Sequence, residues 1–191
     1  MRYCASMGWR LFLKRSEAIN KAELLAKDPA KGLPEDVFLF VSRLTPMLNV
    51  DLLIQDKKGK TLLTWRNDGY GKPGWHIPGG IVRYKEDITT RIRKTALAEL
   101  GTGVDFACSP LAVTEFIHTS RKDRGHFVSL LYKCRLTGTP DNMRMYRAGR
   151  PKPGEWAWHS GCPENLLSFH KVYRRYLQSK GKQNDRPKQA A

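Results

Sequence analysis

The stretch from residue 79 to residue 101 constrains the fold most, because it joins a glycine turn to a helix of defined length. Residues 78–80 read Pro-Gly-Gly and are predicted to interrupt a β-ladder, since proline lacks an N–H donor and glycine is permissive. No glycine or proline occurs from residue 87 to residue 100, which predicts a helix there. Gly101 is expected to end that helix. The unit is therefore a loop, a helix and a loop.

The helix is expected to be amphipathic, because its apolar residues recur at steps of three and four, the period of one helix face. The residues of this stripe are Ile88, Ile92, Ala96, Leu97 and Leu100. On this reading Glu99 falls on the opposite, polar side of the helix. Its carboxylate is then available to a ligand.

This stretch resembles the Nudix box, whose pattern is G-x5-E-x7-R-E-U-x-E-E-x-G-U, where U is a bulky aliphatic residue. The residues that match are Gly80, Glu86, Glu99 and Gly101. The residues that differ are Lys94 for the Arg, Thr95 and Ala98 for two Glu, and Thr102 for the last aliphatic residue. Glu99 is therefore what remains of the carboxylate cluster that the family places for magnesium.

The chain is similar to one branch of that family, the GDP-mannose mannosyl hydrolases, which end the box with a similar M-A-E-L-G. This resemblance covers residues 33 to 170 and includes Arg43, Asp51, Arg66, Trp75 and the glycines at 79 and 80. It implies an α/β (α+β) Nudix fold, in which a mixed β-sheet is sandwiched between α-helices. It also implies a magnesium-dependent hydrolase of a nucleotide sugar such as GDP-mannose, and it suggests a homodimer.

The resemblance implies that Glu99 and the Gly79 carbonyl hold Mg²⁺, with Mn²⁺ as an alternative, and that Glu99 is thereby needed for catalysis. Mg²⁺ commonly binds one or two protein oxygens and completes its octahedron with substrate phosphates and water. Glu86 is interpreted as structural support that stabilises the start of the helix or pairs with Lys94. Gly80 and Gly101 are the structural glycines of the box.

Four residues are predicted to bind the substrate. Arg66 ends a strand and matches an Arg that the branch directs at the sugar diphosphate, a role that suits a guanidinium. Asp51 lies in an apolar strand, where it holds a base or a sugar hydroxyl or pairs with Arg43. Arg83 replaces an Arg that the branch has at position 81, and His126 has a His counterpart in the branch.

The general base is not fixed by the sequence. The branch uses a His a few residues before a late Trp, but residues 152–155 before Trp156 contain none. His118 and His159 are the preferred candidates, with His126 and Glu155 as alternatives.

Three functions remain open on this basis. In the branch, water attacks C1 of the sugar and GDP leaves. In other Nudix enzymes, water attacks phosphorus of a nucleoside triphosphate or of another diphosphate. The third alternative is an impaired Nudix domain that binds a nucleotide or nucleic acid without turnover.

Composition favours one domain with extensions at both ends. The chain has 191 residues and a formal net charge of +16, which attracts anionic substrates, and no nucleic-acid-binding motif accompanies the charge. A small nucleotide is therefore the expected partner rather than nucleic acid. Residues 1–32 are read as a basic helical extension, 33–178 as the Nudix domain and 179–191 as a disordered basic tail. No membrane span or signal peptide is recognised, so a cytoplasmic location is expected.

The remaining pattern alternates strand and helix signals. Strands are expected at 49–56, 60–66, 112–118, 126–136 and 155–159, helices at 36–44 and 163–178, and loops at 69–78 and 137–154.

Overall fold

A computed structural model describes residues 16–69 and 71–177. The predicted tail, 179–191, and the first fifteen residues of the N-terminal extension lie outside the described residues. No helix among the described residues is both long and apolar enough to cross a membrane.

The larger sheet has five strands and is mixed. The strand order is β4-β1-β7-β5, and β6 pairs with the other part of β7. β1 and β7 run parallel, while the remaining pairs are antiparallel. The strands are β1 (Met47–Ile54), β4 (Gly79–Ile81), β5 (Val104–Phe106), β6 (Ala112–Ile117) and β7 (His126–Leu136).

The smaller sheet is antiparallel, with the order β3-β2-β8. Its strands are β2 (Thr61–Arg66), β3 (Gly74–His76) and β8 (Trp156–His159). The stretch from residue 69 to residue 78 was expected to be a loop, but it contains β3, which pairs with the end of β2.

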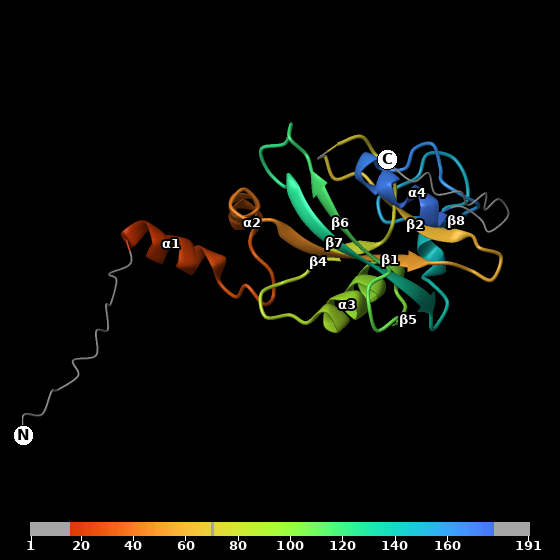
Figure 1. Ribbon diagram of the computed structural model, residues 1–191, viewed down its shortest axis with the longest axis horizontal. Coiled ribbons are helices and arrows are strands. Elements are labelled where there is room, and N and C mark those ends of the chain that lie inside the picture. Colours follow the sequence, from red (N-terminus) through yellow and green to blue (C-terminus); the bar gives the residue numbers. More distant parts are fainter. Residues whose placement is uncertain (1–15, 70, 178–191) are drawn as a thin grey trace, which may run out of the picture.

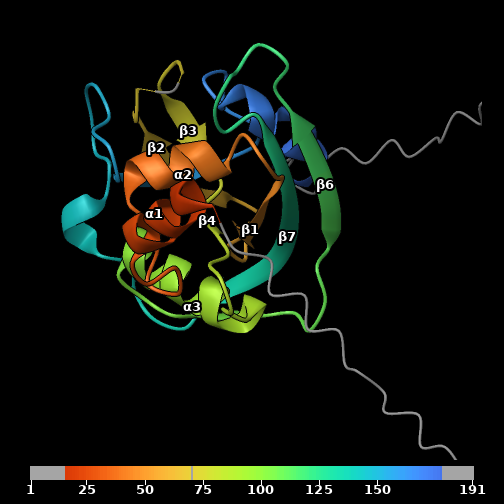
Figure 2. The same cartoon turned by 90° about the vertical axis from the view of Figure 1, so that its left-hand side faces the viewer.

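The helices are α1 (Glu17–Ala26), α2 (Glu35–Val41), α3 (Ile88–Leu100) and α4 (Arg174–Leu177). Two 3-10 helices, η1 (Asn142–Arg144) and η2 (Ser168–Tyr173), complete the described elements. Figures 1 and 2 show α1 and α2 at one end of the larger sheet, with α1 projecting from the body of the molecule.

Two hydrophobic clusters lie on the two faces of the larger sheet. On one face, Ile92 and Ala96 of α3 pack with Leu52 and other side chains of β1. On the other face, Leu53 packs with residues of β2 and β3 and with Tyr173. Figure 1 shows α3 and α4 on opposite sides of the larger sheet. The expected mixed fold with helices on both sides is thus confirmed.

The prediction that the glycine pair interrupts the ladder is wrong. Gly79 and Gly80 lie in β4, where they pair with Asp51 and Val50 of β1. A Cβ on Gly79 would lie 2.5 Å from Asp51 Oδ1, and one on Gly80 would lie 2.4 Å from Thr95 Oγ1. The glycines therefore let β4 fit between β1 and α3.

The predicted face of the box helix also needs correction. Leu97 was placed in the buried stripe, but it is 64% exposed, whereas Thr95 is 3% exposed. Glu99 was assigned to the polar side, but its carboxylate points toward β2 and β4. The buried face is rotated from the predicted one because Thr95 packs against the glycine strand. The helix does end at Gly101, in the left-handed conformation at φ 69°.

The closing helix predicted at 163–178 is replaced by η2 and the four-residue α4. Before η2 the chain makes a turn at 164–165 and then pairs with β3. Trp75 N–H donates to the Asn165 carbonyl, and Leu167 N–H donates to the Trp75 carbonyl. Tertiary pairing therefore overrides the helical pattern.

Candidate active site

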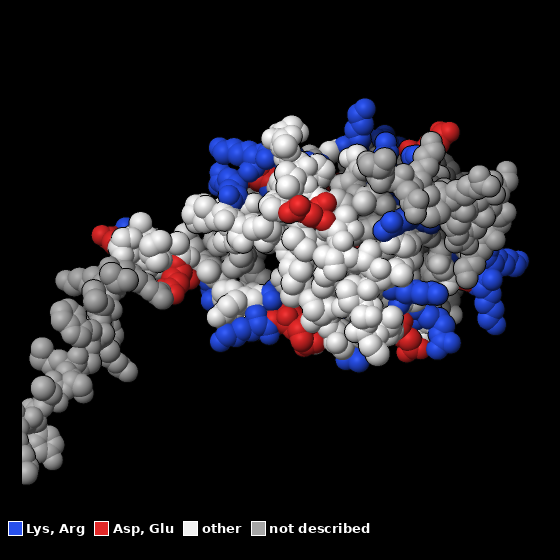
Figure 3. All heavy atoms as spheres, in the orientation of Figure 1, with Lys and Arg blue, Asp and Glu red and all other residues white. Residues whose placement is uncertain are grey.

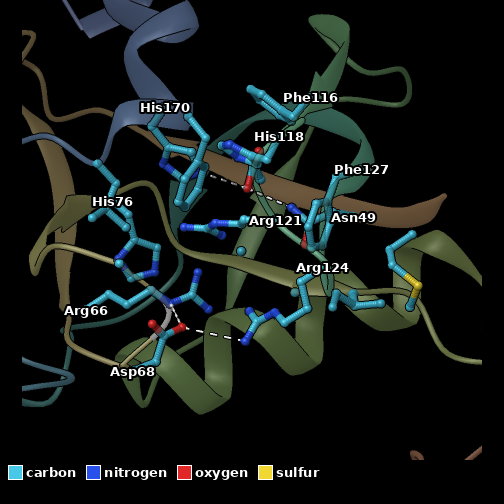
Figure 4. Close-up of a pocket in the computed structure, with 18 of the residues that line it drawn as sticks. Asn49, Arg66, Asp68, His76, Phe116, His118, Arg121, Arg124, Phe127 and His170 are labelled. Carbon is cyan, nitrogen blue, oxygen red and sulfur yellow. Dashed lines mark hydrogen bonds and ion pairs between the residues drawn. The ribbon is translucent and has the colours of Figure 1, made fainter. Parts of the chain in front are cut away.

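A cavity of about 920 Å³ lies at the edge of the larger sheet. Its walls come from β1, β3 and β4, from the segment that contains α2, from the loop between β6 and β7, and from the segment around η2. Figure 4 shows that its side chains converge from these elements, which are far apart in the sequence.

The cavity is rich in cations. Seven of its lining residues are Lys or Arg and three are Asp or Glu, which favours an anionic ligand. The cations are Arg66, Lys72, Arg83, Arg91, Arg121, Arg124 and Lys171, and the acids are Asp51, Asp68 and Glu164. On the face of the molecule in Figure 3, the Lys and Arg side chains are scattered over the surface.

The predicted site residues divide into two groups. The residues that line the cavity are Asp51, Arg66, Gly79, Gly80, Arg83 and His118. The described residues that lie outside its lining are Glu86, Glu99, Gly101, His126 and His159.

Glu99 lies directly behind the glycine strand. Its Oε1 accepts a hydrogen bond from Gly79 N–H at 3.0 Å, and its Oε2 accepts one from Thr64 Oγ1 at 2.7 Å. His76 Nε2 is 3.6 Å from the same Oε2. Burial raises the pKa of Glu99, but the neighbouring His76 and the hydrogen bonds from Thr64 and Gly79 outweigh burial and hold this pKa below its usual value. The carboxylate is thus ionised at neutral pH.

This arrangement fits a magnesium ion that takes most of its ligands from a substrate. One ionised carboxylate lies beside the backbone of Gly79, and no group of three or more acidic, His or Cys side chains that could hold a metal occurs among the described residues. Mg²⁺ commonly binds one or two protein groups together with phosphate oxygens and water. An ion held by this carboxylate would take its remaining ligands from a diphosphate and from water.

Asp51 belongs to a buried polar cluster rather than to an ion pair with Arg43, which pairs with Asp123 instead. The Asp51 carboxylate is 1% exposed and accepts hydrogen bonds from three side chains: Asn49, Ser129 and Tyr173. Burial raises the pKa of Asp51 to about 6, against the opposing effect of these hydrogen bonds. Asp51 packs against Gly79 and lines the cavity, so this buried polar cluster lies next to the proposed site.

His170 was not predicted as part of the site, yet it lines the cavity and is 3% exposed. Its Nδ1 accepts a hydrogen bond from Ile77 N–H at 2.9 Å, and its Nε2 lies 3.8 Å from Asp51 Oδ1. Burial, followed by the charges of His76 and Arg66, holds the pKa of His170 well below its usual value. The imidazole is therefore neutral, with its proton on Nε2.

The four base candidates occupy different environments. His118 faces the cavity, and burial together with Arg121 lowers its pKa, so the ring is neutral and able to accept a proton. His126 pairs with Glu115 at 3.0 Å outside the cavity lining. His159 packs against Trp75 on the other side of β3, with ring centroids 4.5 Å apart.

Glu155, the fourth candidate, accepts a hydrogen bond from Lys152 N–H in a turn before β8. Of the four candidates, His118 alone is among the residues that line the cavity.

The other two predicted residues are engaged with the protein. Arg83 lines the cavity, but its Nη1 donates a hydrogen bond to the Lys31 carbonyl. Glu86 accepts hydrogen bonds from Arg91, Lys94 and the backbone N–H of Arg83, as expected for a residue that supports the helix start.

Sequence reasoning missed His76, Arg121 and Arg124. His76 precedes the Pro-Gly-Gly segment and, at alternate spacing in β3, turns toward Thr64, whose carbonyl is 2.8 Å from its Nδ1. A polar residue in a short strand beside the glycine pair was the available signal. Arg121 and Arg124 lie in a loop, and no periodicity marks loop residues.

The fold is a mixed sheet with a cation-rich cavity beside a glycine strand and a carboxylate-bearing helix, an arrangement whose charge suits phosphorylated ligands. The sequence model of the NUDIX domain family matches residues 45–178, and this match shows that the chain belongs to the Nudix family.

Similar proteins of known sequence or structure are consistent with this family assignment. The chain is 28% identical over 123 residues to the low-salt glycan biosynthesis protein Agl8 of Haloferax volcanii, covering 63% of this chain and 77% of that protein. The MutT NUDIX hydrolase of Burkholderia pseudomallei is similar in structure, with a TM-score of 0.57, 19% identity, and coverage of 70% of this chain and 99% of that one. The MutT protein of Methanosarcina mazei has a TM-score of 0.52 and 18% identity, with coverage of 70% and 91%. At these identities the two structures bear on the fold alone.

Proposed function

We propose that this chain is a magnesium-dependent hydrolase of a nucleoside diphosphate linked to another group, namely a nucleotide sugar such as GDP-mannose. The observation that carries the proposal is the ionised Glu99 carboxylate, held directly behind Gly79 at the wall of a cavity lined by seven cationic residues. The cavity volume of about 920 Å³ suits a ligand of nucleotide-sugar size.

Glu99 and the Gly79 carbonyl are the protein groups proposed to hold Mg²⁺ or Mn²⁺. The ion, when bound, supplies positive charge that stabilises the negative charge of the leaving diphosphate. Arg66, at the end of β2, adds a guanidinium whose parallel donors match phosphate oxygens.

The proposed reaction is attack of water on C1 of the sugar. A bond forms between the water oxygen and C1, the bond from C1 to the diphosphate oxygen breaks, and GDP leaves with that electron pair. His118 is proposed to take the proton of the water, because its imidazole is neutral and faces the cavity. A diphosphate needs little protonation to leave, so one base is sufficient.

The relative in Haloferax volcanii supports the sugar side of the proposal, since its name places it in glycan biosynthesis. The cytoplasmic location and the homodimer stay predictions made from the sequence.

The test is product analysis with a panel of nucleotide sugars and Mg²⁺, followed by ³¹P and ¹H NMR. Free sugar and nucleoside diphosphate are expected. Nucleoside monophosphate and sugar phosphate would establish attack at phosphorus instead. Binding of nucleotide without release from any substrate would identify an impaired domain, an outcome that the absence of acids at Thr95 and Ala98 keeps open.

A further inference from the structure

One carboxylate that lines the cavity is paired with two arginines from different elements. Asp68 Oδ2 is 3.3 Å from Arg66 Nε and 3.8 Å from Arg124 Nη1. Arg66 ends β2, whereas Arg124 belongs to the loop between β6 and β7. Figure 4 shows the two arginine side chains approaching Asp68 from different elements. The Asp68 carboxylate thus links the end of β2 to the loop between β6 and β7 through two ion pairs.

Contacts away from Asp68 fix the position of Arg124. Its backbone N–H donates to Ser42 Oγ at 3.0 Å, and its guanidinium lies over the ring of Phe38, 5.8 Å from the centroid. The preceding residue, Asp123, pairs with Arg43 at 3.2 Å. The loop is therefore anchored to the segment around α2, and Arg124 can keep its place without Asp68.

Asp68 is the more exposed residue of its pair with Arg124. Its side chain is 35% exposed, compared with 16% for Arg124. The next residue, Gly69, has a positive φ of 78°, and an added Cβ there would meet no atom within 4 Å. A carboxylate with this exposure can turn toward solvent while Arg124 keeps its contacts with Ser42 and Phe38.

The arrangement of one anionic oxygen between two guanidiniums is also the one that a phosphate oxygen takes in proteins. Arg66 is already a proposed diphosphate contact. The Asp68 carboxylate therefore occupies a position where an anionic group of the ligand would gain the same two contacts.

We propose that Asp68 is an intramolecular substitute for a substrate phosphate. It neutralises an anion subsite formed by Arg66 and Arg124, and the substrate must displace it. Arg124 then becomes a second guanidinium contact to the phosphate, and Asp68 sets how tightly the cavity binds its substrate. The inference rests on the proposed function for the role of Arg66.

The test measures binding of inorganic pyrophosphate to the full chain by titration calorimetry, in EDTA and at low salt. Asp68→Asn keeps the size of the side chain and removes its charge. The variant is expected to bind pyrophosphate about three- to tenfold more tightly, the range for removing one partly screened negative charge at ion-pair distance.

Asp105→Asn is the matched control. Asp105 pairs with Arg135 at 2.8 Å outside the cavity lining, so this variant makes the same change in net charge without touching the subsite. Its effect on pyrophosphate binding is expected to be less than twofold. If Asp68→Asn bound pyrophosphate no more tightly than Asp105→Asn, or more weakly than the unchanged protein, Asp68 would be a positioning residue and the inference would be overturned.

Arg124→Gln gives a second measurement. It is expected to weaken pyrophosphate binding and to reduce the gain from Asp68→Asn when the two changes are combined, because the competition takes place at Arg124. Purely additive effects would contradict a shared subsite. Urea unfolding of each variant establishes that the fold is intact. Tighter pyrophosphate binding by Asp68→Asn with no hydrolysis of any nucleotide sugar would uphold the subsite and reject the proposed function.

Discussion

Glu99→Gln is the most direct perturbation of the proposed metal site. Glu99 accepts one hydrogen bond from Gly79 N–H and one from Thr64 Oγ1. The glutamine carbonyl can keep the first bond, and its amide can donate to the Thr64 hydroxyl, which also accepts. The substitution therefore removes the charge with little change in shape.

The expected cost to folding is about 1–2 kcal/mol, because two charge-assisted hydrogen bonds become neutral ones. The expected cost to catalysis is larger. Neutralising the carboxylate proposed to hold the ion should lower turnover at least ~100-fold, or about 2.7 kcal/mol of transition-state stabilisation. A loss of transition-state stabilisation larger than the loss of unfolding free energy would show that Glu99 acts in catalysis and not only in folding.

Two assays measure the two effects. Product release from a nucleotide sugar gives turnover, and titration with Mn²⁺ in the presence of GDP, followed by electron paramagnetic resonance, gives metal affinity. Glu115→Gln is the control, because Glu115 is an exposed acid that pairs with His126 outside the cavity lining. Wild-type turnover and Mn²⁺ affinity in Glu99→Gln would refute the assignment of Glu99 as the metal ligand.

Three further predictions follow from the packing. Gly80→Ala should destabilise the fold by about 1–3 kcal/mol in urea unfolding, since its Cβ would lie 2.4 Å from Thr95 Oγ1. The cost should be smaller when Gly80→Ala is made in the Thr95→Ala variant. An equal cost in the unchanged protein and in Thr95→Ala would contradict the contact. Below pH 6.5, His170 binds fewer protons in the folded protein than in the unfolded chain, so the protein loses stability as the pH falls from 6.5. The variant His170→Asn keeps an acceptor for Ile77 N–H and should lose less stability than the unchanged protein between pH 7.5 and 5.5. An equal loss in the two proteins would refute this prediction. Glu86→Gln should lower the melting temperature by several degrees, because it weakens the ion pairs with Arg91 and Lys94 at the start of α3. An unchanged melting temperature would show that these ion pairs do not stabilise the fold.

The box helix could be predicted because its signals are local. The helical period, the absence of glycine and proline, and the terminal Gly101 all act within a few residues. The same signals could not fix its orientation, because Thr95 is buried by its contact with Gly80, which is distant along the chain. Leu97 was therefore assigned to the wrong face.

The cavity was harder to predict than the helix. His170 lies in a segment whose helical pattern is overridden by backbone pairing with β3. Arg124 lies in a loop against α2, and that loop has no periodic pattern. His76 was within reach of sequence reasoning because it lies close to the Pro-Gly-Gly segment, but the strand that orients it, β3, was expected to be a loop. Arg83 could be placed at the cavity, but not its hydrogen bond to Lys31.

The reduced set of carboxylates follows from how closely β4 approaches α3. Thr95 is 3% exposed, and its hydroxyl is packed against Gly80, so that a longer acid at this position would meet the glycine strand. Ala98 is exposed, and an acid there would face solvent. Glu99 is the helix position whose side chain passes between β2 and β4. With a single carboxylate admitted, further ligands must come from the substrate phosphates, so binding of metal and of nucleotide should be coupled.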